Sequence, residues 1–105
     1  MFIHMFAFRW TSKATPGLKH KVIAAIRGLQ GAIPGLLETY VGENVSPRSQ
    51  GYELGGVMKF PNQAAFHAYS EHPEHQKAQE EGRQRYYSEY SVQVCVLERE
   101  SRFTL

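Results

Sequence analysis

The sequence has a single cysteine, Cys95, among its 105 residues, so no disulfide can form within the chain. Small secreted scaffolds held together by disulfides are therefore excluded, and a reducing compartment is the expected environment. Cys95 lies in a stretch with the alternation of a β-strand, where a lone cysteine usually packs as a small core residue. We expect Cys95 to be structural.

Neither sign of charge dominates the chain. Twelve Lys and Arg residues stand against ten Asp and Glu residues, which gives a formal net charge of +2, and the basic residues are scattered. A nucleic-acid-binding surface needs basic residues that gather on one face. We therefore expect no nucleic-acid partner.

Long apolar runs are also missing, since none approaches the roughly 20 residues that a membrane helix needs. The first ten residues are apolar but include His4 and Arg9, and no small-residue cleavage site follows them, so we interpret them as part of the fold. We expect no membrane partner and a cytoplasmic location. A chain of this length forms one domain that gains buried surface by pairing with a second copy.

Residues 2–10 follow the two-residue period of a β-strand. Both faces of this strand are apolar: one carries Phe2, His4, Phe6, Phe8 and Trp10, and the other carries Ile3, Met5 and Ala7. A sheet covered by helices on one side only would place polar residues on the other side. Something must bury the second face, and a partner subunit is the simplest cover.

A helix follows this first strand. Thr15 is a typical N-cap before Pro16, and apolar residues recur at helical spacing as far as Ile33. Pro34 and Gly35 then end the helix, because proline restricts the residue before it and glycine readily reverses the chain.

The rest of the chain alternates between strand and helical patterns. Strands are predicted over residues 36–42, 52–60 and 90–97, with turn residues over 43–51. Asn62 caps a short helix, and Pro73 begins a second helical piece that extends to about residue 86. Gly55 and Gly56 lie within the third strand, where such a pair indicates a bulge or a close approach to the backbone; we favour the bulge.

The order of elements is strand, helix, strand, strand, helical pair, strand. This order defines an α+β, ferredoxin-like βαββαβ fold with a four-stranded antiparallel sheet and its helices on one face. The second apolar face predicts that two copies stack sheet on sheet into a dimeric α/β barrel.

Proton-handling side chains concentrate between residues 69 and 75. Tyr69, His72 and His75 are suited to acid–base chemistry, because a tyrosine donates a hydrogen bond and a histidine titrates near neutrality. The same residues also suit an ordinary junction between helices, with His72 as a cap or hinge before Pro73 and Tyr69 packed in the core. His4 is either a satisfied core histidine or part of a polar patch shared with His75.

In combination, several motifs resemble those of the stress-responsive A/B barrel (Dabb) family. They are the His4 strand, Ile33-Pro34-Gly35, Gly42-Glu43-Asn44-Val45-Ser46, Gly51-Tyr52, and Tyr69 followed by His72-Pro73-Glu74-His75. The resemblance implies a Dabb domain over residues 1–98, a C-terminal tail over 99–105, and a homodimer of ferredoxin-like domains. The family includes plant stress proteins, a plant polyketide cyclase and many bacterial members without an assigned activity.

The cyclase branch implies catalytic roles for His4, Tyr69 and His75. There, the matching residues line a pocket between sheet and helices and close a ring by an aldol-type reaction. The resemblance makes His75 the general base and Tyr69 the group that orients or polarises a carbonyl, with His4 assisting. A small hydrophobic or aromatic molecule would fill the pocket, and the predicted ligand-binding residues are Phe6, Phe8, Val22, Ile26, Met58 and Phe66.

Two other functions stay open at this point. A stress-linked structural or interaction protein would fill the same interior with aromatic side chains and perform no chemistry. A cofactor-independent monooxygenase is suggested only by analogy of fold. A cavity of about 300 Å³ or more, reached by the three polar side chains, would favour ligand binding.

The sequence predicts no cofactor and no metal site. His72 and His75 would need a third ligand such as His4 or Cys95 to hold zinc, and no second paired motif supplies one. The resemblance leaves open a magnesium ion on backbone carbonyls at the end of the first helix, which would be those of Gln30, Ile33 and Leu36.

Overall fold

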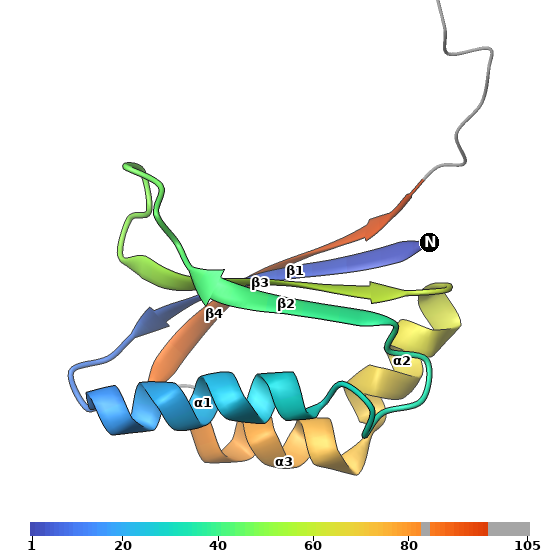
Figure 1. The fold of residues 1–105 in the computed structure, drawn as a ribbon, viewed down its shortest axis with the longest axis horizontal. Helices are drawn as coiled ribbons and strands as arrows, with labels where there is room; N and C mark the ends of the chain where they lie inside the picture. The colour runs from blue at the N-terminus through green and yellow to red at the C-terminus, as the bar shows by residue number, and fades with distance from the viewer. Residues whose placement is uncertain (83–84, 97–105) are drawn as a thin grey trace, which may run out of the picture.

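The computed structural model describes residues 1–82 and 85–96, which form a sheet layer packed on a helical layer (Figure 1). The elements are β1 (Phe2–Trp10), α1 (Pro16–Gly28), β2 (Glu38–Glu43), β3 (Tyr52–Phe60), α2 (Gln63–Glu71), α3 (Pro73–Gly82) and β4 (Tyr87–Cys95). The strand order is β2-β3-β1-β4, and every neighbouring pair is antiparallel. The predicted ferredoxin-like fold is confirmed.

The face of the sheet that packs on the helices holds the core. His4, Phe6 and Phe8 are buried and alternate with more exposed residues along β1, as the period of a strand requires. Met58 and Phe60 of β3 are the largest fully buried side chains. The predicted inward direction of the aromatic face of β1 is confirmed.

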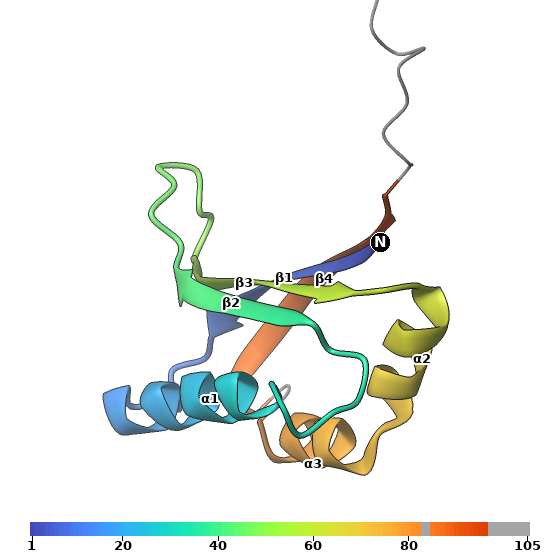
Figure 2. The ribbon, with the colours of Figure 1, turned by 45° about the vertical axis from the view of Figure 1, so that its right-hand side comes forward.

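No described helix covers the opposite face of the sheet, as Figures 1 and 2 show. This open face is apolar, and its exposed side chains include Met5, Tyr40, Tyr90, Val92 and Val94. Soluble monomers rarely expose large contiguous apolar patches, and such patches mark interaction sites. The second apolar face predicted from β1 therefore continues onto β3 and β4, while Lys59 and Glu38 form an ion pair on the same face.

The two central glycines of β3 have different surroundings. Gly56 pairs with Phe6 across the sheet, and a Cβ atom at Gly56 would overlap the Phe6 ring, whereas a Cβ at Gly55 would meet nothing within 4 Å. Gly56 thus lets an aromatic ring lie directly against the strand. The predicted bulge at these glycines is wrong, because the register between β1 and β3 shifts at Phe8 and Arg9 instead.

Helix α1 ends at Gly28, earlier than the predicted end near Ile33. Gly31 has a φ of +86°, a left-handed conformation that interrupts the helix. Leu29 and Ile33 are nevertheless buried. Their apolar spacing therefore continues through a turn that packs on the sheet as a helix would.

The junction of α3 and β4 also differs from the prediction. Helix α3 ends at Gly82 rather than near residue 86, and β4 begins at Tyr87 rather than at Tyr90. The Tyr87 ring stacks on Phe8 with centroids 4.0 Å apart, and it occupies the space that a Cβ at Gly82 would need. This packing fixes Tyr87 as the first residue of the strand. The predicted tail over 99–105 lies outside the described residues.

Within residues 1–82 and 85–96, no helix has the length and hydropathy needed to cross a membrane. Cys95, expected to pack in the core, is instead exposed near the end of β4. That expectation is wrong, because β4 is an edge strand and its last residues extend beyond the helical layer.

Candidate functional site

Three elements bring the predicted catalytic residues together beneath the sheet. His4 comes from β1, Tyr69 from the last turn of α2, and His75 from the first turn of α3. The ring centroids of Tyr69 and His75 are 4.2 Å apart, and those of His4 and Tyr69 are 6.2 Å apart. The structure thus places Tyr69 and His75 in contact, with the His4 ring farther from Tyr69.

The junction between α2 and α3 makes this contact possible. His72 has an extended backbone conformation that ends α2, and Pro73 begins α3. The Nδ1 atom of His72 accepts a hydrogen bond from the Glu74 amide at 3.1 Å, so His72 caps α3. The predicted capping role of His72 is confirmed, and the cap turns α3 so that His75 faces Tyr69.

His75 has a defined orientation. Its Nδ1 atom lies 3.3 Å from the backbone carbonyl oxygen of Ser70. A carbonyl can only accept a hydrogen bond, so Nδ1 carries the proton of the neutral ring and Nε2 is the basic nitrogen. In this tautomer, Nε2 is the ring nitrogen that can accept a proton.

Tyr69 is 4% exposed. Burial raises the pKa of its hydroxyl above the ordinary value, and the nearby Glu89 and Tyr87 raise it further. The hydroxyl therefore stays protonated across the physiological range, as a hydrogen-bond donor to a carbonyl or an enolate oxygen must.

His4 is buried, with 6% exposure, among Phe6, Phe66 and Tyr69. Its Nδ1 atom lies 3.1 Å from the amide nitrogen of Gln93 on β4, which donates to it. Burial, followed by the nearby His75, lowers the pKa of His4 from 6.5 to about 4. His4 is therefore neutral at pH 7 and cannot act as a charged acid there.

The neutral state of His4 predicts a pH-dependent stability. The unfolded chain binds a proton at this residue below about pH 6.5, whereas the folded chain binds it only below about pH 4. The free energy of unfolding should therefore fall as the pH drops from 6.5 to 4, by about 3 kcal/mol in total. Urea unfolding at several pH values would measure this loss, and the slope should largely disappear in His4→Phe. An unchanged slope in that variant would assign the loss to other groups.

A small cavity of about 40 Å³ lies next to the Tyr69–His75 pair. Its walls are Phe6, Phe8, Ile26, Leu29, Met58, Tyr69, His75, Gln79, Tyr87 and Glu89. It is smaller than the roughly 300 Å³ of a typical ligand pocket. The aromatic side chains of β1 thus fill most of the interior beneath the sheet.

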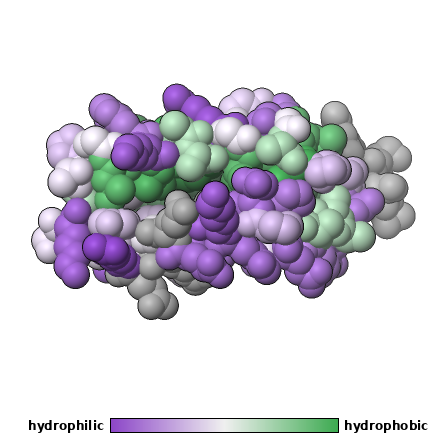
Figure 3. All heavy atoms as spheres, turned by 90° about the horizontal axis from the view of Figure 1, so that it is seen from below, coloured by the Kyte–Doolittle hydropathy of each residue, from purple (hydrophilic) through white to green (hydrophobic). Residues whose placement is uncertain are grey.

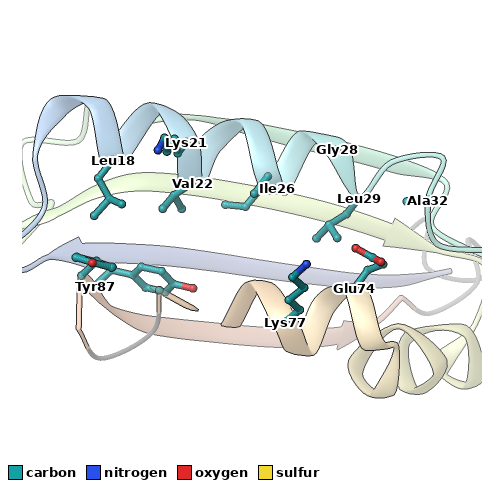
Figure 4. Close-up of a pocket in the computed structure, with 13 residues that line it drawn as sticks. Leu18, Lys21, Val22, Ile26, Gly28, Leu29, Ala32, Glu74, Lys77 and Tyr87 are labelled. Atoms are coloured by element: carbon teal, nitrogen blue, oxygen red, sulfur yellow. The ribbon is translucent and has the colours of Figure 1, made fainter. Parts of the chain in front are cut away.

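A larger groove of about 400 Å³ separates α1 from α3 (Figure 4). It is lined by Leu18, Lys21, Val22, Ala25, Ile26, Gly28, Leu29, Ala32, Glu74, Lys77, Gly82, Tyr86 and Tyr87. Ile26, Leu29 and Tyr87 line both the groove and the small cavity. These three side chains form a wall that the two spaces share, with Tyr69 and His75 on the side of the small cavity.

The predicted ligand-binding residues are distributed over these two spaces. Phe6, Phe8 and Met58 line the small cavity, Val22 lines the groove, and Ile26 lines both. Phe66 lines neither space and instead stacks on Phe2, at 4.9 Å between ring centroids, and packs against His4. His4 also lines neither space.

Sequence reasoning missed several wall residues, chiefly Tyr87 and Glu89. The strand period could have found them, because alternation from the outward-facing Val92 and Tyr90 places Glu89 and Tyr87 on the inward face. The start predicted for β4 was too late to include them.

Within the described part of the chain, no three His, Cys, Asp or Glu side chains are close enough to hold a metal ion. The carbonyl oxygens proposed for magnesium already take part in protein hydrogen bonds at two positions. The side-chain amide of Gln30 donates to Leu36 O at 2.9 Å, and the Leu36 amide donates to Ile33 O at 3.3 Å. The side chain of Gln30 therefore stabilises the turn after α1.

The two-layer fold with an open apolar sheet defines a ferredoxin-like α+β protein of the kind that forms barrels. The Stress Responsive A/B Barrel Domain (Dabb) profile matches residues 2–94. The chain belongs to the Dabb family. No curated protein matches the sequence.

Solved structures share this fold. A dimeric ferredoxin-like protein of unknown function from Thermobifida fusca is 27% identical, with a TM-score of 0.77 and 90% of each chain covered. A Dabb family protein from Mesorhizobium loti is 19% identical, with a TM-score of 0.80 over 92% of this chain and 97% of that one. The hydroxynitrile lyase from Passiflora edulis is 18% identical, with a TM-score of 0.84 over 94% and 95%.

Proposed function

We propose that the protein is a homodimer that binds a small hydrophobic or aromatic carbonyl compound and removes a proton next to its carbonyl group. In this proposal, the apolar body of the ligand lies in the groove between α1 and α3, and its carbonyl end reaches the small cavity. His75 accepts the proton at Nε2, and the Tyr69 hydroxyl donates a hydrogen bond to the developing enolate oxygen.

The observation that carries this proposal is the contact between an imidazole and a protonated phenol at the wall of one cavity. Tyr69 and His75 lie 4.2 Å apart by ring centroids, and both line the small cavity. The groove on the other side of the shared wall has a volume within the range of small-molecule sites, but none of His4, Tyr69 and His75 lines it. His4 acts through packing, since it contacts Tyr69 and lines neither space.

The neighbouring structures support parts of the proposal. The Passiflora edulis neighbour is a hydroxynitrile lyase, so an enzyme exists on this fold. The Thermobifida fusca neighbour is dimeric. The exposed apolar face of the sheet is the surface that a second copy would cover, as in a sheet-on-sheet dimer. The cytoplasmic location and the domain boundary at residue 98 stay predictions.

Proton abstraction can be measured without knowledge of the natural substrate. Acetophenone in D₂O exchanges its methyl protons for deuterium when a base forms the enolate, and proton NMR follows the loss of signal. The wild-type protein should accelerate this exchange, because His75 accepts the proton and the solvent returns a deuteron to the same carbon. His75→Ala lacks the base, so the acceleration that it gives should be at least about 100-fold smaller than that of the wild type.

Two further variants make the exchange experiment specific. Tyr69→Phe keeps the ring and removes the donor, so it should retain binding and lose about 10- to 100-fold in exchange rate. His67→Ala removes an exposed imidazole from α2 that lines neither space, and it should exchange at the wild-type rate. Equal exchange by wild type and His75→Ala would favour the alternative of a structural protein with a filled interior.

A further inference from the structure

The groove between α1 and α3 is apolar along its floor and charged at its rim. Leu18, Val22 and Ile26 of α1 and its C-cap residue Leu29 face α3 (Figure 4). Figure 3 shows apolar side chains exposed along this helical face and bordered by hydrophilic ones. A molecule that fits the groove therefore has an apolar body and at least one polar end.

The charges at the rim come from both helices. Lys21 belongs to α1, and Lys77 and Glu74 belong to α3. Figure 4 shows Lys77 and Glu74 extending from α3 toward the apolar side chains of α1. Among the described residues that line the groove, two ammonium groups and one carboxylate give a net positive charge.

Lys21 and Lys77 differ from the lysines that form ion pairs within the fold. Lys19 pairs with Glu53 and Lys59 pairs with Glu38, each at 3.3 Å. Among the side chains that the structure describes, neither Lys21 nor Lys77 forms an ion pair. Both ammonium groups are therefore available to an anion at the mouth of an apolar groove.

We infer that the substrate is an amphipathic carboxylic acid, with its carboxylate at Lys21 and Lys77 and its reacting carbonyl separated from that carboxylate by an apolar body. The carbonyl end extends past Ile26, Leu29 and Tyr87, which line both spaces, to Tyr69 and His75. This inference rests on the proposed function for the carbonyl end. The anion site itself rests only on the groove and its lysines.

The expected selectivity follows from the strength of exposed charge pairs. Each lysine at a groove mouth contributes a few-fold in affinity for a carboxylate, so the two together should contribute about tenfold. Salt should screen this contribution, because the Debye length falls from about 30 Å at 0.01 M to about 3 Å at 1 M. A neutral ligand of the same shape should show neither effect.

Two matched ketones test the inference. 4-Acetylbenzoate and 4-acetylbenzamide have the same ring and the same reacting methyl ketone, and they differ in the charge at the far end. NMR titration of the wild-type protein should give 4-acetylbenzoate an affinity about tenfold higher, and this advantage should shrink at high salt. Glu74→Gln should increase the advantage, since it removes a carboxylate that lines the groove.

Variants assign the advantage to the lysines. The double variant Lys21→Met, Lys77→Met should bind both ketones equally and should bind 4-acetylbenzamide as wild type does. Lys13→Met removes an exposed lysine that lines neither space, and it should keep the tenfold difference. Equal affinities in the wild type, or an advantage that survives the double variant, would overturn the inference.

Deuterium exchange of the same two ketones separates this inference from the proposed function. If both ketones bind equally and exchange in a His75-dependent manner, the proposed carboxylate selectivity is wrong, and the proposed role of His75 as the base is supported. If 4-acetylbenzoate binds tenfold tighter through the lysines but does not exchange, the proposed anion site is supported, and the proposed role of His75 as the base is wrong. If neither ketone binds, both proposals fail.

Discussion

Replacing Gly56 with alanine is expected to lower the free energy of unfolding by about 2 to 3 kcal/mol, the range of a strongly overpacked core. The new Cβ would overlap the Phe6 ring. That ring is buried between His4 and Phe8, at 5.5 and 5.4 Å between centroids, so it has little room to move. The midpoint of thermal unfolding should fall by roughly 10 to 20 °C. Urea and thermal unfolding followed by circular dichroism would measure both effects.

A matched control and a double variant show that the loss comes from this contact. Gly42→Ala introduces the same methyl group on β2, where nothing lies within 4 Å, and it should change the unfolding free energy by less than about 0.5 kcal/mol. In a Phe6→Ala background the ring is gone, so Gly56→Ala should be nearly neutral there. A full loss in both backgrounds would mean that the contact with the Phe6 ring is not the cause.

Replacing Val92 with aspartate is expected to convert a dimer into a monomer. Val92 lies on the open face of the sheet opposite Met5, which itself pairs with Val57. A twofold interface on this face would bury one new carboxylate from each copy in apolar surroundings. The dissociation constant should rise by at least about 100-fold. Sedimentation velocity at micromolar concentration should give the mass of two chains for the wild type and of one chain for Val92→Asp.

The control for this prediction places the same charge elsewhere. Ser12→Asp lies in an exposed segment before α1, away from the sheet face, and should remain dimeric. A monomeric wild type would contradict the proposed dimer. A Val92→Asp variant that stays dimeric would place the interface on another surface.

The fold was largely predictable because its strongest signals are local. The alternation of His4, Phe6 and Phe8 determines which face of β1 is buried, and proline and glycine residues mark the ends of helices. The predictions were wrong where contacts between residues far apart in the sequence determine the structure. The stacking of Tyr87 on Phe8 sets the start of β4, and Gly56 accommodates Phe6 instead of forming a bulge.

The candidate site was predictable only in part for the same reason. The order of elements, together with the family resemblance, allowed the convergence of His4, Tyr69 and His75 to be expected. The size of the cavity depends on rotamers of packed rings that no sequence pattern encodes. Lys21 and Lys77 gave no signal, because exposed lysines are ordinary on amphipathic helices; only the packing of α1 beside α3 places them at the mouth of one groove.

The central claim is that a ligand enters between α1 and α3 and reaches the cavity beside Tyr69 and His75. Methyl NMR during titration with 4-acetylbenzoate tests it most directly, with labels on Ile26, Met58 and Ile33. Ile26 lines both spaces and Met58 lines the cavity, whereas Ile33 is buried and lines neither. If the ligand enters this way, the Ile26 and Met58 methyl signals should shift until saturation, and the Ile33 signal should not shift. Unchanged Ile26 and Met58 signals at saturating ligand would contradict it.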